Sequence, residues 1–249
     1  MKRDKYTISN TLGMFDYLKG IIMILIMLFH TYGLMDYVSE HEAELNIAIE
    51  TMLELMLVFS ESLMPILFII SGYGFRSTTM NKCFKKQFKL LIVPYVITSV
   101  VTLIIHMISY YLLYGGIRFA IKNTFYLFIG FLFGFSKETE LNGVVWPTCG
   151  PVWFLLALFI GMLVFNLLLK WFEGKKLLAI SFVISCVGWG LSFLNILPWC
   201  ISQGLVSTLY ICFGYLAKKN KFFIIQKRKD IIVVFFLCIT ILDVFMVRF

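Results

Sequence analysis

Long apolar runs, separated by short polar or basic segments, dominate the chain. Most of them have about the 20 residues that a helix needs to cross the hydrocarbon core of a bilayer. The runs lie near 18–35, 51–75, 90–114, 119–135, 152–172, 177–196, 200–217 and 230–247. This pattern predicts an all-α fold, a polytopic transmembrane helical bundle with about seven or eight hydrophobic segments.

Composition strengthens this prediction. Of the 249 residues, 60% are hydrophobic and only 14% are charged, and the mean hydropathy is +0.90. A soluble domain cannot bury so much apolar surface. No Pro-, Gly- or Ser-rich linker interrupts the chain, so a single integral-membrane domain over 1–249 is expected.

The positions of the basic residues predict orientation. The net charge of +8 could indicate nucleic acid, but the lysines and arginines flank the apolar runs, as orientation signals and lipid contacts do. No nucleic-acid partner is therefore expected. The basic N-terminal segment predicts a cytoplasmic N-terminus, the acidic loop 36–50 lies outside, and the basic loop 76–89 lies inside.

The run 119–135 conflicts with this orientation if it crosses. If it is re-entrant or interfacial instead, 18 of the 22 lysines and arginines lie on the cytoplasmic side. Its aromatic and glycine-rich sequence suits packing against protein. A misplaced boundary between 90 and 135 is the alternative. Of the six scattered cysteines, Cys149 and Cys200 share the predicted outer face, and a disulfide between them stays open.

The first apolar run places a histidine inside the membrane. Lys19 and His30 are eleven residues apart, so they share one helix face with a rise of about 16 Å, half the hydrocarbon thickness. Ionisable groups at this depth usually mark a functional site. The structural alternatives are a snorkelling lysine and a core histidine bonded to a neighbouring helix.

The second run ends in a serine-glycine motif followed by Arg76. If Arg76 and Lys19 share the inner interface, Glu61 lies slightly above His30, where its carboxylate could orient the imidazole. The alternative for Glu61 is the lining of a wet outer vestibule. The three histidines are dispersed, so no metal site is expected.

Two further segments carry candidate chemistry. Lys85, Lys86 and Lys89 could clamp the phosphates of a nucleotide-bearing donor, although orientation alone explains their charge. Trp153 opens a helix from the predicted outer side, where an aromatic-belt anchor is the alternative to an acceptor contact.

Together these segments resemble the acyltransferase-3 family of integral-membrane acyltransferases, and in particular its fucose 4-O-acetylase-like and polysaccharide O-acetyltransferase branch. The matching motifs are Lys19 to His30, "MPILFIISGYGFR" from Met64 to Arg76, "FKKQFKLLIVPY" from Phe84 to Tyr95, and "WFL" from Trp153 to Leu155. The resemblance is strongest over residues 10–220. Lys19 stands where many members have arginine, and members are commonly longer, which raises the expectation of a C-terminally truncated member.

The resemblance implies transfer of an acyl group, usually acetyl, from cytoplasmic acyl-CoA to a hydroxyl of an extracytoplasmic carbohydrate or glycolipid. It places the chain in the cytoplasmic membrane of a bacterium, with acyl-CoA as co-substrate and no bound cofactor. His30 would act as general base or transient acyl acceptor, with Glu61 beside it. Lys19 and Arg76 would hold donor phosphates or polarise the thioester. The rival interpretation is a non-enzymatic transporter or export component of polysaccharide assembly, since an intramembrane histidine also suits a proton relay.

Overall fold

The computed structural model describes residues 15–26, 63–141, 143–193 and 197–220. They belong to two compact units: unit 2 is Arg76–Cys212, and unit 1 holds the described residues before and after it. Within the described residues, the helices long and apolar enough to cross a membrane are Met80–Tyr114, Gly150–Leu168, Gly174–Ser192 and Pro198–Lys219. The helical membrane class is confirmed, while the count of seven or eight segments stays a prediction because four runs lie partly or wholly outside the described residues.

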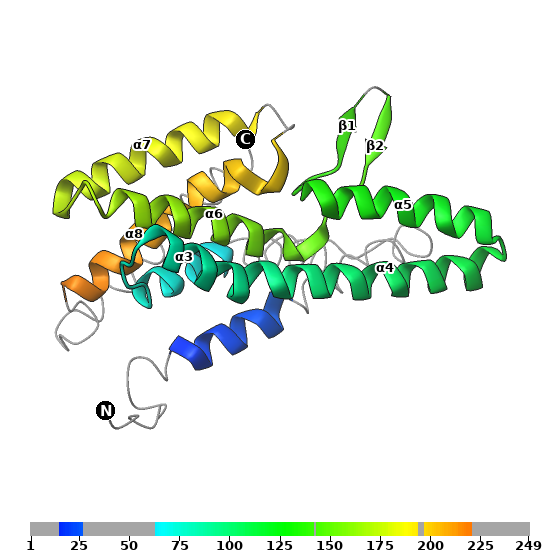
Figure 1. Ribbon diagram of the computed structural model, residues 1–249, viewed down its shortest axis with the longest axis horizontal. Coiled ribbons are helices and arrows are strands. Elements are labelled where there is room, and N and C mark those ends of the chain that lie inside the picture. The colour runs from blue at the N-terminus through cyan, green and yellow to red at the C-terminus, as the bar shows by residue number, and fades with distance from the viewer. Residues whose placement is uncertain (1–14, 27–62, 142, 194–196, 221–249) are drawn as a thin grey trace, which may run out of the picture. The chain divides into compact units, whose positions relative to one another are not determined.

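Unit 2 is helical except for one short hairpin (Figure 1). Its elements are α3 (Met80–Gln87), the π-helix η1 (Phe88–Ile92), α4 (Val93–Tyr114), α5 (Ile117–Phe133), strands β1 (Thr139–Leu141) and β2 (Val144–Trp146), the 3₁₀ turn η2 (Gly150–Val152), α6 (Trp153–Leu168), α7 (Gly174–Ser192), the 3₁₀ turn η3 (Pro198–Cys200) and α8 (Ile201–Lys219), which continues into unit 1. The two strands are antiparallel, with Thr139 opposite Trp146.

The basic segment before α4 is helical, not the loop that the sequence analysis expected. Helix α3 starts at Met80 and continues through η1 and α4 to Tyr114. Lysine and glutamine are good helix formers, so charge alone does not break the helix. Pro94 removes a backbone donor and crowds the carbonyl four residues earlier. The wider π turn immediately before it lets the helix continue.

Helices α5 and α6 pack at successive levels along this long helix. Tyr95 bonds to the carbonyl of Phe131, and His106 lies 3.1 Å from Thr124, so α5 runs antiparallel to α4. Helix α6 packs against α3 and η1 instead (Figure 1). The continuous helix has 35 residues and is about 52 Å long, well beyond the hydrocarbon thickness. This arrangement is compatible with a segment 119–135 that does not cross, which stays a prediction.

Small residues bring α8 close to α6 and α7, as is common between membrane helices. A β-carbon on Gly204 would lie 2.6 Å from the β-carbon of Ile160, and one on Gly188 would lie 2.6 Å from that of Leu205. The core around these contacts is apolar, with Phe165 and Ile211 fully buried. The three helices therefore form a tightly packed support for the residues at their ends.

Unit 1 brings the ends of separate segments together. It contains the helix over residues 15–26, the helix Leu63–Tyr73 and the end of α8 from Phe213. The rings of Phe15 and Tyr73 are 4.7 Å apart, and the ammonium of Lys218 lies 5.9 Å from the Tyr73 ring. A β-carbon on Gly214 would collide with the Ile69 carbonyl, so only glycine allows this approach. The serine-glycine motif, residues 71–74, is thus packed through Tyr73 against both the helix over residues 15–26 and the end of α8.

Candidate functional site

Lys19 lies on the packed stripe of the first helix. Phe15, Ile22 and Ile26 are buried, and their spacing places them on one helix face. Lys19, four residues after Phe15, falls on the same face. Its side chain is 42% exposed, and its ammonium lies 3.5 Å from the carboxylate of Asp16. This position is compatible with the functional interpretation and with a snorkelling lysine, so the role of Lys19 stays a prediction.

Removing the charge of Lys19 is expected to impair function, whereas Lys19→Arg is expected to preserve it, because the site needs a cation at this height more than one particular shape. Acylation of the native acceptor in a null strain is the measurement. Tyr17→Phe, an exposed position two residues away, is the matched control. Equal activity of Lys19→Ala and wild type would reduce Lys19 to an orientation signal.

The other two residues of the predicted catalytic group, His30 and Glu61, lie outside the described residues. Their roles stay predictions from the sequence. The described part of the first helix, residues 15–26, stops short of His30.

Four lysines form a cationic stripe on the helix that opens unit 2. Lys82, Lys85, Lys86 and Lys89 are all exposed, and their spacing of three, four and seven residues places them on about one face of α3 and η1. No acidic residue occurs between Met80 and Ile92. Like charges at this spacing repel one another. The lysine stripe is therefore suited to a ligand that carries several negative charges.

Arg76 belongs to the same end of unit 2 as the lysine stripe. It is exposed and lies four residues before α3. Arg76 thus stands on the segment that leads into the lysine stripe. Donor binding by Arg76, Lys85, Lys86 and Lys89 stays a prediction. Lys19 belongs to unit 1.

A buried amide anchors the segment between Arg76 and α3. Asn166, on α6, is fully buried. Its carbonyl oxygen accepts a hydrogen bond of 3.2 Å from the backbone N–H of Thr78, and its amide donates one of 3.1 Å to the Thr78 carbonyl. Thr78 is thus held through both of its backbone polar groups. This contact fixes the direction in which the chain leaves Arg76 and enters the lysine stripe.

The sequence analysis missed Asn166. The signal was present: one amide stands among the apolar residues of "WFLLALFIGMLVFNLL". A buried polar side chain of this kind needs partners, since leaving it unpaired is costly. Its partner, the backbone of residue 78, is 88 positions away and carries no sequence pattern of its own.

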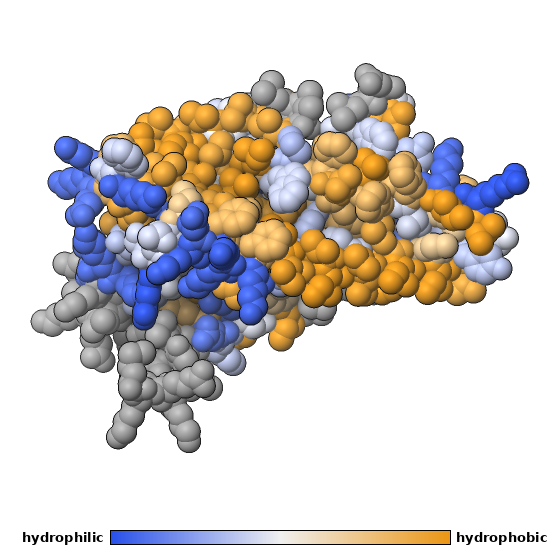
Figure 2. All heavy atoms as spheres, viewed as in Figure 1, coloured by the Kyte–Doolittle hydropathy of each residue, from blue (hydrophilic) through white to orange (hydrophobic). Residues whose placement is uncertain are grey.

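Positive charge is distributed very unevenly along unit 2. Eight of its eleven lysines and arginines lie at one end, the end where Asn166 meets Thr78. They occur either before or within η1 or directly after α6. These residues are Arg76, Lys82, Lys85, Lys86, Lys89, Lys170, Lys175 and Lys176. Figure 2 shows hydrophilic side chains gathered around α3 and the α6–α7 turn, and a hydrophobic band along α4. Such an asymmetry is what the positive-inside rule describes.

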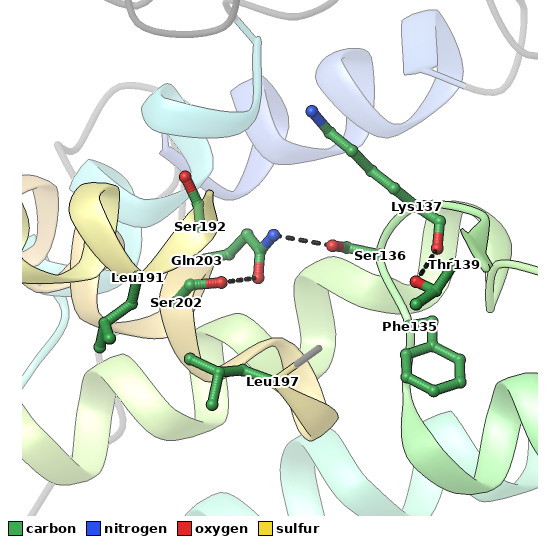
Figure 3. A pocket seen from close by; sticks show the side chains of 9 residues that line it. All are labelled: Phe135, Ser136, Lys137, Thr139, Leu191, Ser192, Leu197, Ser202 and Gln203. Atoms are coloured by element: carbon green, nitrogen blue, oxygen red, sulfur yellow. Dashed lines mark hydrogen bonds between the residues drawn. The ribbon is translucent and has the colours of Figure 1, made fainter. Parts of the chain in front are cut away.

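The opposite end of α6 carries Trp153, and a small polar pocket lies at the same end of unit 2, between the segment after α5 and the start of α8. Trp153 is the first residue of α6 and is half-buried, in agreement with the expectation that it opens this helix. In the nearby pocket, the Gln203 amide donates to the Ser136 hydroxyl at 2.7 Å, and Ser202 donates to Gln203 at 2.8 Å (Figure 3). The cavity measures about 20 Å³, which is room for a water molecule rather than a sugar ring.

No group of three or more potential metal ligands occurs among the described residues. The expectation that the chain holds no metal stays a prediction.

The fold and the charge distribution define a helical membrane protein with a cation-rich end. The family model of the acyltransferase domain of the acyltransferase-3 family matches residues 13–247. The chain therefore belongs to this family of membrane acyltransferases. No curated protein and no solved structure matches the chain, so the comparisons assign the family and not a branch, donor or acceptor.

Proposed function

We propose that the chain transfers an acetyl group from cytoplasmic acyl-CoA to a hydroxyl of an extracytoplasmic carbohydrate or glycolipid, as in the fucose 4-O-acetylase-like and polysaccharide O-acetyltransferase branch. The observation that carries the proposal is the lysine stripe beside Arg76. Coenzyme A carries several phosphate charges, and lysine and arginine are the side chains that bind phosphate. The positive-inside rule places this end of unit 2 in the cytoplasm, where acyl-CoA is found, in the cytoplasmic membrane of a bacterium with the N-terminus inside.

In the proposed reaction, His30 accepts the proton of the acceptor hydroxyl while the hydroxyl oxygen attacks the thioester carbonyl. The carbon–sulfur bond then breaks, the acetyl group stays on the acceptor oxygen, and the proton passes to the sulfur of coenzyme A. Lys19 supplies positive charge on the same helix stripe, and Glu61 orients the imidazole. Arg76, Lys85, Lys86 and Lys89 bind the donor, while Trp153 lies on the acceptor side.

Neutralising the lysine stripe is expected to weaken donor binding without stopping the chemistry. With Lys82, Lys85, Lys86 and Lys89 all changed to Gln, KM for acetyl-CoA should rise roughly ten-fold or more, while kcat changes about two-fold or less, because binding common to ground and transition state is lost. Initial rates at varied acetyl-CoA concentration in inside-out vesicles are the measurement.

The matched control changes Lys170, Lys175 and Lys176 to Gln. These lysines lie at the same end of unit 2 but on the α6–α7 turn and the first turn of α7. Their substitution should leave KM for acetyl-CoA unchanged if the lysine stripe binds the donor specifically. An unchanged KM in the stripe variant, at normal membrane yield, would mean that the stripe only orients the chain or contacts anionic lipid, and the donor site would have to be sought elsewhere.

A further inference from the structure

Two cysteines from distant segments meet at the end of unit 2 opposite the lysine stripe. Cys149 lies between β2 and η2, and Cys200 is the last residue of η3, immediately before α8. Both are 1% exposed and both are free thiols in the structure. The two thiols are close enough for each to shift the pKa of the other. They therefore lie near one another although 51 positions separate them along the chain (200 − 149).

The backbone around Gly134 holds both cysteines in place. The backbone N–H of Cys149 donates a hydrogen bond of 2.8 Å to the carbonyl of Phe135. The thiol of Cys200 donates one of 3.1 Å to the carbonyl of Gly134. The carbonyls of two consecutive residues thus accept hydrogen bonds from Cys149 and Cys200. The backbone of Trp199 also lies against Gly134, since a β-carbon on Gly134 would come within 3.2 Å of the α-carbon of Trp199. The fold therefore brings the two cysteines to the same turn.

Cys200 also lies in a strained turn. Trp199 and Cys200 have φ angles of 60° and 51°, in the left-handed region that residues other than glycine rarely adopt. Two successive residues of this kind persist only when their surroundings hold them. A covalent bond from Cys200 to the segment before α6 would supply that constraint.

The location of the pair fits an oxidised state. Under the orientation that the proposed function uses, this end of unit 2 faces outward, where disulfides form and persist. The hydrogen bond with Cys200 lowers the pKa of the Cys149 thiol, against the opposing effect of burial, which favours the thiolate that thiol–disulfide exchange requires. Burial of both sulfurs would then protect the bond from reduction.

We propose that Cys149 and Cys200 form a disulfide bond that ties the segment entering α6 to the start of α8. The two thiols lose two protons and two electrons, and one sulfur–sulfur bond forms. The oxidant is a disulfide-carrying thiol oxidoreductase outside the membrane, whose own disulfide is reduced to two thiols. Oxidation takes place while the chain folds, before the pair is buried. The bond locks the outer ends of α6 and α8, which carry Trp153 and Gln203.

Counting thiols in the intact protein tests the proposal. The full chain is expressed in a membrane and treated with N-ethylmaleimide under denaturing conditions. Mass spectrometry then gives the number of cysteines that have reacted. Of the six cysteines, four should react without a reductant and all six after reduction, and digestion should yield a Cys149–Cys200 linked peptide. Six adducts without a reductant, or a bridge between other cysteines, would overturn the proposal. This result does not depend on acyl transfer, so it is separate from a failure of the proposed function.

Thermal stability gives a second test. Cys149→Ser and Cys200→Ser should each lower Tm in detergent by about 5–10 °C. Cys186→Ser, an exposed cysteine on α7, is the matched control and should not change Tm. If neither serine variant lowers Tm, the bond is absent. Where a serine variant fails to fold, the thiol count on wild type decides.

Discussion

Replacing His30 with alanine is expected to lower acyl transfer by about 10²–10⁴-fold, the usual contribution of a general base, without loss of the folded bundle. From its spacing in the sequence, the imidazole is expected on the Lys19 stripe, about halfway across the membrane. Alanine removes a polar group from an apolar region, so gross misfolding is not expected. Product formation, membrane yield and the size of the detergent-solubilised protein are measured together.

The control for this variant is His106→Ala. His106 lies on α4 and bonds to Thr124 on α5, and it has no spacing relation to Lys19. It should keep near-normal transfer. Near-normal turnover of His30→Ala at normal yield would remove His30 from the catalytic group.

Replacing Asn166 with alanine is the second change expected to have a large effect. It removes both hydrogen bonds to the backbone of Thr78 and leaves these groups without their amide partner, at a cost of about 1–3 kcal/mol in the free energy of unfolding. Because Thr78 lies between Arg76 and the lysine stripe, KM for acetyl-CoA should also rise several-fold while kcat changes less. Tm in detergent and the KM-against-kcat comparison measure the two effects.

Two further variants separate positioning from packing. Asn166→Asp keeps an acceptor but loses the donor and buries a charge, so it should destabilise at least as much as alanine. Asn123→Ala removes an amide on α5 that bonds only to the Phe119 carbonyl and should change neither quantity. A lower Tm for Asn166→Ala with an unchanged KM would leave Asn166 a structural residue without influence on the donor site.

Much of the architecture followed from the apolar runs. Helices α5 to α8 start and end within a few residues of the predicted runs, because the bilayer fixes helix length. The start of α3 was not predicted, since four lysines were taken as a loop although they are compatible with a helix whose lysine face is exposed. Charge patterning sets which side of a membrane a segment faces; it does not end a helix.

The candidate site was predictable where one helix carries the pattern and not where separate segments meet. Spacing along a single helix places Lys19 on the face of Phe15, Ile22 and Ile26. The charge of the lysine stripe was predicted, but its arrangement on one helix face was not, because a loop was expected over these residues. The Asn166 bonds to Thr78 depend on how α6 packs on α3, which no local pattern encodes. For Cys149 and Cys200, the shared face was predictable, whereas the thiol contact depends on the turn around Gly134.

The most direct test of the account is the fate and sidedness of labelled acetyl-CoA. Inside-out and right-side-out vesicles would be prepared from cells that carry the chain and its own envelope carbohydrate, and isotopically labelled acetyl-CoA would be added outside. The account predicts base-labile label on carbohydrate in the inside-out vesicles, little in the right-side-out vesicles, and none with His30→Ala. Label that stays on coenzyme A, or that enters the lumen without forming an ester, would contradict acyl transfer and favour a transport component.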